Sequence, residues 1–181
     1  MNKKLYSILV ALLITMLATS NVLAGGNVKL SASITSGSPL HVDGIITGGT
    51  GNTLGVTVTL TGFGDVINVT CTNPQGNQSP GQNPGRVTVT GAQPVSYQQL
   101  QAGNVPIEFS AGAPVFPRAC PNHKWTVTGY AIAWTRATID ITDNALPSGS
   151  NLMLHQEYTC ALQPGSTTAY VCTFVSETRY F

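Results

Sequence analysis

The longest strand-like segment of the chain covers residues 125–143, and its pattern of large apolar residues restricts the possible folds strongly. These residues occupy even positions in the first part of the segment and odd positions in the later part: Tyr130, Ile132 and Trp134, then Ala137, Ile139 and Ile141. Because strand side chains alternate between two faces, an unbroken strand would expose one of these two sets. The sequence therefore predicts a bulge or bend near Thr135 and Arg136, and a corner between two sheets.

The first 24 residues have the pattern of a secretory signal peptide. Residues 1–4 are a basic start, residues 5–17 are an apolar run, and a small-residue cleavage motif ends at Ala24. A helix that spans a bilayer needs about 20 apolar residues. This apolar run is shorter, because polar residues 19–21 end it. We expect cleavage after Ala24, one domain over residues 25–181, and a secreted extracellular protein with no transmembrane segment in the mature chain.

The charge of the mature chain excludes one class of partner. Removing the signal peptide takes away two of eight basic residues, which leaves six Lys and Arg against seven Asp and Glu. Nucleic-acid binding needs a basic surface for phosphates, so we expect no nucleic-acid partner. A nearly neutral chain also has little electrostatic protection against self-association.

Four cysteines remain after processing, and an exported protein can pair all of them. Three connectivities are possible. Cys160 and Cys172 flank a turn signal at residues 163–166, and a hairpin centred there places the two cysteines opposite each other. Cys71 and Cys120 then pair by elimination. We expect no metal or redox centre at these cysteines, because the sequence has no C-x-x-C motif and no histidine at ligand spacing from a cysteine.

Short strand patterns separated by turn residues continue along the whole mature chain. A turn is expected at residues 62–65 and a surface loop at residues 73–85, and no helical periodicity follows residue 24. The expected strands are residues 28–35, 40–46, 54–60, 67–71, 86–90, 95–100, 105–109, 125–143, 152–162 and 168–175. This spacing predicts an all-β fold, specifically an antiparallel immunoglobulin-like β-sandwich. A closed barrel is the alternative.

Four motifs occur in a fixed order: C-T-N-P-Q-G-N at 71–77, P-G-Q-N-P at 80–84, V-T-V-T-G at 87–91 and C-P-N-H-K-W-T at 120–126. In this order they resemble a group of uncharacterised, secreted, β-rich bacterial proteins. The resemblance covers residues 54–142 and implies no known activity. It also implies that Cys71 and Cys120 occur together, whereas the second cysteine pair lies outside the motifs.

The sequence contains no recognisable catalytic constellation. It has no G-x-S-x-G motif, and its three histidines occur in dissimilar contexts: His41, His123 and His155. His41 and Asp43 share a strand face, but no third partner can be named, which favours a solvated polar face. Glu108 and Glu157 are the glutamates within expected strands, and no feature of the sequence brings them together. We therefore expect no enzyme, no catalytic residue and no cofactor.

A calcium site at Asp140, Asp143 and Asn144 is a possible alternative, because hard cations take clustered oxygen ligands. Asp and Asn also favour turns through their own backbone hydrogen bonds. The turn interpretation is preferred, so we expect no metal ligand in the chain.

Aromatic residues provide the candidate ligand contacts. Tyr130 and Trp134 follow the core pattern of their strand, so Trp125 and Tyr97 are the residues that we predict to be exposed for stacking against a ligand. Repeated Thr-x-Thr pairs could instead form a hydroxyl face for ice or a polymer, although Thr is also an ordinary solvent-facing strand residue. The pairs are Thr57/59/61, Thr70/72, Thr88/90 and Thr126/128.

The function expected from these features is that of a secreted, non-enzymatic extracellular or cell-surface protein. It would act by assembly through exposed sheet edges or by binding, and its partner would be a second copy or an extracellular polysaccharide. The alternatives are a carbohydrate-binding module and an enzyme of unrecognised type.

Overall fold

The computed structural model describes residues 27–35, 39–49, 54–116, 119–167 and 169–180. The expected signal peptide and its cleavage site lie outside these residues. The described part is all-β, with one short helix. The elements are β1 (Lys29–Thr35), β2 (His41–Thr47), β3 (Val56–Thr72), β4 (Gln78–Pro80), β5 (Gly85–Val95), α2 (Tyr97–Gln101), β6 (Val105–Ser110), β7 (Thr126–Asp143), β8 (Leu152–Leu162) and β9 (Tyr170–Arg179).

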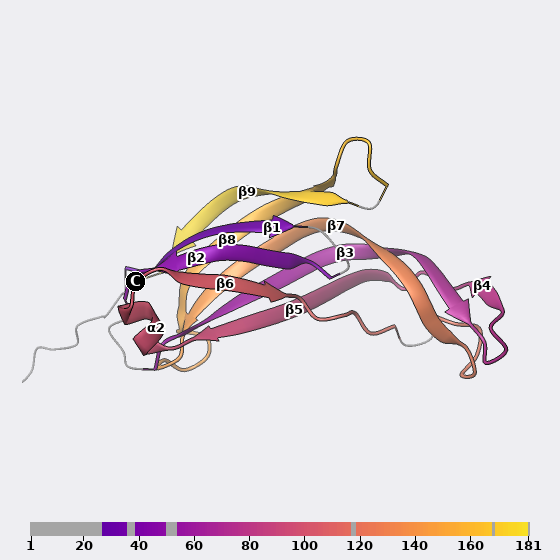
Figure 1. Ribbon diagram of the computed structural model, residues 1–181, viewed down its shortest axis with the longest axis horizontal. Helices are drawn as coiled ribbons and strands as arrows, with labels where there is room; N and C mark the ends of the chain where they lie inside the picture. The colour runs from indigo at the N-terminus through magenta and orange to yellow at the C-terminus, as the bar shows by residue number, and fades with distance from the viewer. Residues whose placement is uncertain (1–26, 36–38, 50–53, 117–118, 168, 181) are drawn as a thin grey trace, which may run out of the picture.

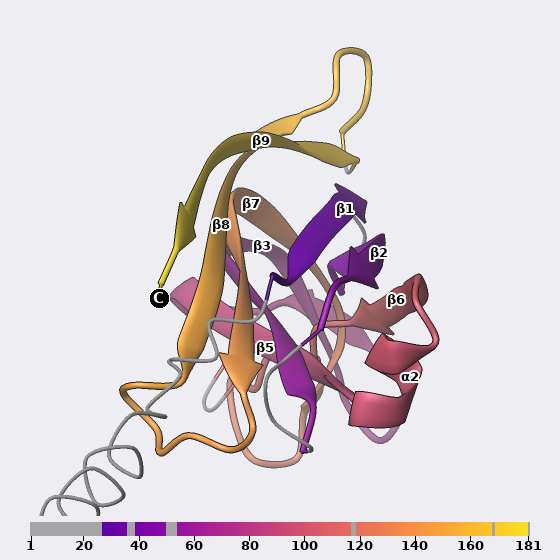
Figure 2. The same cartoon turned by 90° about the vertical axis from the view of Figure 1, so that its left-hand side faces the viewer.

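The strands form one antiparallel sheet that curls into a half-barrel (Figure 1, Figure 2). Its order is β4-β3-β7-β8-β9-β1-β2-β6, and β5 also pairs with β3. The curl brings β5 close to β6, and the Gln93 side chain links the two strands. Its Nε2 donates to the Pro106 carbonyl at 3.4 Å, and its Oε1 accepts from the Glu108 amide at 3.0 Å. A side chain thus connects two strands that do not pair through their backbones.

The immunoglobulin-like arrangement of two sheets is not confirmed. The strands form one continuous sheet, because β1 pairs with β9 at two positions, Ile34 with Cys172 and Thr35 with Val171. A side-chain hydrogen bond from β8 to β1 adds to this two-residue pairing. Gln156 Nε2 donates to the Leu30 carbonyl of β1 at 3.1 Å.

The expected turn at residues 62–65 is wrong, because β3 runs through this segment without a break. Gly62 and Gly64 make room for the indole of Trp134 instead. A Cβ atom would lie 2.9 Å from the indole at Gly62 and 3.1 Å from it at Gly64. Glycine within a strand often marks such a close approach. The two expected strands on either side therefore merge into one.

The predicted irregularity in the central strand is confirmed. Phe63 of β3 pairs with Arg136 of β7 while Gly64 pairs with Trp134, so Thr135 is the additional residue of a bulge. The side chain of Trp134 is buried on one side of the bulge, and the Arg136 guanidinium lies over the Phe63 ring at 4.2 Å. Both apolar sets of β7 thus reach the core, and the bend lies within one continuous sheet.

The strand expected at residues 95–100 is also wrong, because this segment contains the end of β5 and helix α2. Ser96 caps α2: its hydroxyl accepts from the Gln99 amide, and the Gln99 side chain accepts from the Ser96 amide. This reciprocal capping box satisfies two backbone donors and favours the helix over an extended strand. The side chain of Leu100, in the same helix, is buried.

Two smaller differences occur around the first cysteine. Asn68 has a positive φ of 56°, and the β3–β7 register shifts between Ile67 and Thr70. As a result Val66 is buried, while Ile67 is only half-buried. The polar segment expected as a loop contains the three-residue strand β4, which pairs with the end of β3.

The apolar side chains form two clusters. The main cluster fills the interior of the curled sheet and includes Trp134. A smaller cluster surrounds Cys71 and contains Val66, Val69 and Ala119. Disulfides join Cys71 to Cys120 and Cys160 to Cys172, with Cα–Cα distances of 5.7 and 4.0 Å. The second pair lies directly opposite in the β8–β9 register. Across the described segments, no helix has the length and apolar character needed to cross a membrane.

Candidate functional site

A cavity of about 970 Å³ lies beside the Cys71–Cys120 disulfide. It is bordered by Phe116, Asn122, His123 and Trp125, and by Gln82 from the segment after β4. This volume is at the upper end of the range for small-molecule sites, about 300–1,000 Å³. The cavity is therefore large enough for an organic ligand of several rings.

The segment after β4 forms one wall of the cavity because glycine lets it approach the disulfide. The Gly81 amide donates to the Val69 carbonyl at 2.7 Å, and the Gln82 amide donates to the Ala119 carbonyl at 2.8 Å. A Cβ atom on Gly81 would lie only 2.8 Å from the Cys71 sulfur. Backbone hydrogen bonds and the disulfide thus hold the Gln82 wall against the Ala119 segment.

Trp125 is positioned by the turn that precedes β7. Its amide donates to the Asn122 carbonyl at 3.1 Å, and the Asn122 side chain accepts from the Lys124 amide at 2.9 Å. The indole is half-buried and packs against the small cluster around Cys71. One part of the ring is therefore anchored, while Trp125 also borders the cavity.

The cavity combines aromatic rings with side chains that can form hydrogen bonds. Phe116 packs edge-on against Tyr130, with ring centroids 4.7 Å apart. Gln82, Asn122 and His123 contribute amide and imidazole groups. Among the described residues that line it, none is Asp or Glu. This composition suits stacking and hydrogen bonding to a neutral ligand, and it provides no pair of carboxylates for acid–base hydrolysis.

The structure does not bring Tyr97 and Trp125 together. Tyr97 begins α2, which lies at the left end of the molecule in Figure 1, whereas Trp125 immediately precedes β7 near the β4 end. The other two aromatic residues follow their expected pattern, since Trp134 is buried and Tyr130 is half-buried beside Phe116. Trp125 is thus the predicted ligand contact that borders a cavity.

The residues considered for calcium each contact another group of the chain. The Asp143 carboxylate accepts from the Ala145 amide at 2.7 Å, and the Asn144 side chain accepts from the Thr57 hydroxyl at 2.8 Å. Asp140 instead lies 2.6 Å from a ring nitrogen of His155. The Asp143 contact is the kind of local backbone hydrogen bond that the turn interpretation describes.

The Thr-x-Thr pairs do not form one array. Thr61 of β3 pairs with Thr90 of β5, whereas Thr72 contacts Thr128 at 2.7 Å between hydroxyl oxygens, near the β4 end. The hydroxyl groups are therefore distributed over separate parts of the sheet.

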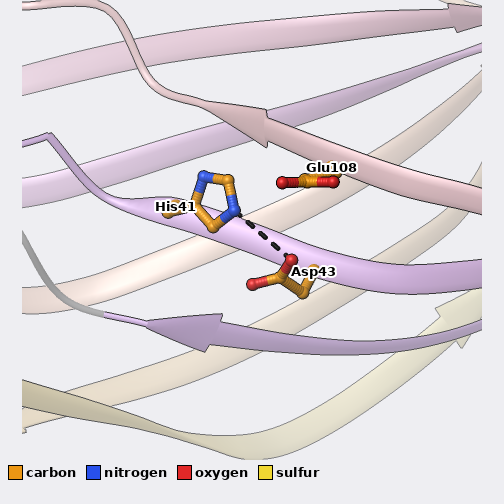
Figure 3. Close-up of side chains that lie close together, drawn as sticks. All are labelled: His41, Asp43 and Glu108. Atoms are coloured by element: carbon orange, nitrogen blue, oxygen red, sulfur yellow. Dashed lines mark ion pairs between the residues drawn. The ribbon is translucent and has the colours of Figure 1, made fainter.

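A second group of polar side chains lies on β2 and β6 (Figure 3). His41 and Asp43 share a face of β2, as expected, and Glu108 of β6 stands directly opposite Asp43. One nitrogen or oxygen atom from each of the three lies within 4.8 Å of the others. Glu108 is the third partner that the sequence did not reveal, because the pairing of β2 with β6 is not encoded in any local pattern.

A third group joins β7 and β8. His155 Nδ1 lies 2.6 Å from Asp140, and His155 Nε2 lies 3.5 Å from Glu157. Burial lowers the pKa of His155, but the hydrogen bond and the charge of Asp140, with a further contribution from Glu157, outweigh this effect. The net result is a pKa raised above 6.5. Glu157 thus belongs to a different site from Glu108.

Comparison with models of known protein families finds no match to this chain, and comparison with curated proteins finds no significant relative. The geometry of the cavity beside Trp125 is therefore the basis for the functional proposal.

Proposed function

We propose that the protein is a secreted, non-enzymatic protein that binds an extracellular carbohydrate in the cavity beside Trp125. The observation that carries this proposal is the anchored indole of Trp125 at a cavity that also offers amide and imidazole groups. Sugar rings present apolar faces to aromatic side chains and hydroxyl groups to amides. Export is supported by the two disulfides and by the signal-peptide pattern of residues 1–24.

The proposal is tested by screening the secreted chain on a glycan array and measuring the affinity of the best ligand by calorimetry. Trp125→Ala should weaken binding about fivefold or more, because stacking contributes roughly 1 kcal/mol. Tyr97→Ala is the matched control and should bind as the unchanged chain does, since Tyr97 lies on α2. Circular dichroism should show that both variants keep the fold.

Two results would contradict the carbohydrate proposal. One is an array with no glycan ligand, and the other is an equal loss of affinity in the Trp125 and Tyr97 variants. Hydrolysis of a bound glycan by the purified chain would contradict its non-enzymatic part.

Self-assembly is a second candidate function, favoured by apolar side chains on β9 and the end of β8. The exposed fractions of Leu162, Val171, Phe174 and Val175 are 46, 49, 51 and 57%. The turn between the two strands projects from the body of the sheet (Figure 1, Figure 2). Leu162 and Phe174 lie on the same face of the hairpin as the disulfide and Val171 lies on the other, so a second copy of the chain would cover part of this surface.

A further inference from the structure

Three potential metal ligands converge on the outer face of β2 and β6 (Figure 3). We propose that His41, Asp43 and Glu108 bind a divalent transition-metal ion, and that zinc is the ion that fits them best. This site is separate from the Trp125 cavity and does not depend on the carbohydrate proposal.

The strand register places the three side chains together. His41 and Asp43 are two residues apart on β2, so they project from the same face. In the antiparallel β2–β6 pair, Asp43 stands opposite Glu108 and His41 stands opposite Ser110. Two carboxylates directly opposite each other on neighbouring strands repel. A bound cation would convert this repulsion into attraction.

The imidazole of His41 is already oriented for coordination. Its Nδ1 lies 2.9 Å from the Ser110 hydroxyl oxygen, while its Nε2 faces the Asp43 carboxylate at 3.3 Å. Metal-binding histidines usually donate the N–H of the other ring nitrogen to a neighbouring acceptor, which fixes the tautomer and the ring. Ser110 can accept that hydrogen bond and leave the Nε2 lone pair directed toward the two carboxylates.

The distances are compatible with one ion after a small adjustment. The ligand atoms lie within 4.8 Å of one another, whereas two ligands of a tetrahedral zinc ion lie about 3.4 Å apart. Asp43 and Glu108 are both exposed, so rotation of either carboxylate can close this difference. Solvent can supply the remaining ligands, because a shallow hollow of about 470 Å³ adjoins both carboxylates.

The donor set selects the class of ion. An imidazole nitrogen favours zinc, copper, nickel and iron over calcium and magnesium, whereas carboxylates accept both groups. Zinc binds one nitrogen and two carboxylate oxygens readily and imposes little geometric preference of its own. A site with three protein ligands also leaves a coordination position open to water or to a ligand group.

The chain contains an internal comparison for this arrangement. His155 also contacts two carboxylates, but Asp140 lies at its Nδ1 and Glu157 lies at its Nε2. The carboxylates therefore stand at different edges of the ring, and a single ion cannot contact all three groups. His155→Gln removes a histidine from a His–Asp–Glu group that does not converge, which makes it the matched control.

Calorimetric titration of the untagged, disulfide-intact chain with zinc chloride tests the proposal, after EDTA treatment and removal of the chelator. The unchanged chain should bind one ion. His41→Gln and Asp43→Asn should each lower the affinity more than tenfold, while His155→Gln should leave it unchanged. Ser110→Ala should lower the affinity about tenfold, as expected for a residue that orients a ligand, and Ser110→Thr should restore it.

Three outcomes would overturn the metal site: no stoichiometric zinc binding, equal affinity in the His41 variant, or an equal loss in the His41 and His155 variants. Preferential binding of calcium chloride over zinc chloride would also overturn it, because the imidazole would then not be a ligand. Circular dichroism of each variant separates a lost ligand from a lost fold.

Discussion

The imidazole of His155 contacts two carboxylates, one at each ring nitrogen. Asp140 lies at one ring nitrogen and Glu157 at the other, and Arg136 also contacts Glu157 at 3.8 Å. The raised pKa of His155 means that the folded chain binds this proton more tightly than the unfolded chain does. The resulting stabilisation is fully present below the unfolded pKa of 6.5 and is lost as the pH rises through the higher folded pKa.

We therefore predict that His155→Gln lowers the free energy of unfolding more at about pH 5.5 than at about pH 8.5. The difference should fall within the range of partly exposed ion pairs, ~0.2–1 kcal/mol. Urea unfolding at the two pH values measures it, with His123→Gln at an exposed position as the control. A loss of stability that is the same at both pH values would show that the carboxylates do not stabilise the imidazolium.

At this scale the sequence predicts a residue's environment when local periodicity determines it. The buried position of Trp134 follows from alternation along its own strand. The role of Gly62 and Gly64 does not, because it depends on an indole from β7 that lies against them. Glu108 is similar: it faces Asp43 although their positions differ by 65 in the sequence, and only the β2–β6 pairing brings them together.

At the scale of elements, strands with regular alternation and clear turn residues are the ones that the sequence predicts correctly. β1, β2, β6 and the β8–β9 hairpin lie close to their expected ranges. The bulge at Thr135 was also predictable, because one strand cannot bury two apolar sets of opposite alternation. Helix α2 was missed because five residues show no helical period, although the Ser96 and Gln99 capping pair was present in the sequence.

The two disulfides constrain the chain to different extents. Cys71 and Cys120 are 49 residues apart, whereas Cys160 and Cys172 are 12 residues apart within one hairpin. Closing the longer loop removes more conformational freedom from the unfolded chain, by about 1 kcal/mol in the chain-entropy description. Cys120 of the longer bridge also lines the Trp125 cavity.

We predict that the double substitution Cys71→Ala/Cys120→Ala destabilises the chain about 1 kcal/mol more than Cys160→Ala/Cys172→Ala does. Guanidinium unfolding of both variants under identical conditions measures the difference, and the parent chain provides the reference. Equal losses, or a larger loss from the hairpin bridge, would show that loop entropy does not determine their contributions.

At the scale of the whole molecule, the curl of the sheet determines which surfaces are available for association. The sequence predicted exposed edges, but the Gln93 side chain links β5 to β6 through two hydrogen bonds. The Gly112 amide adds a hydrogen bond to the Thr90 carbonyl at 2.8 Å. Backbone groups that are already bonded are less available to a strand from another chain. The curl itself was not predictable, because it depends on which distant strands pair.

Association through side chains therefore fits the structure better than strand addition at these edges. Val175 is the most exposed of the apolar residues on β9, at 57%, and it is the additional residue where the β8–β9 register shifts. Residues 25–181 contain six basic and seven acidic residues, so net charge offers little repulsion between copies. Apolar contact between β8–β9 hairpins is the expected mode of assembly.

We predict that the chain forms dimers or larger species as its concentration rises, and that Val175→Lys shifts it to the monomer, because a charge at the contact must lose its hydration. Light scattering after size-exclusion chromatography measures the mass across a concentration series. Leu146→Lys is the matched control, since Leu146 is 49% exposed in the turn between β7 and β8. A chain that remains monomeric at every concentration would exclude self-assembly, and equal dissociation by both substitutions would place the contact elsewhere than on the hairpin.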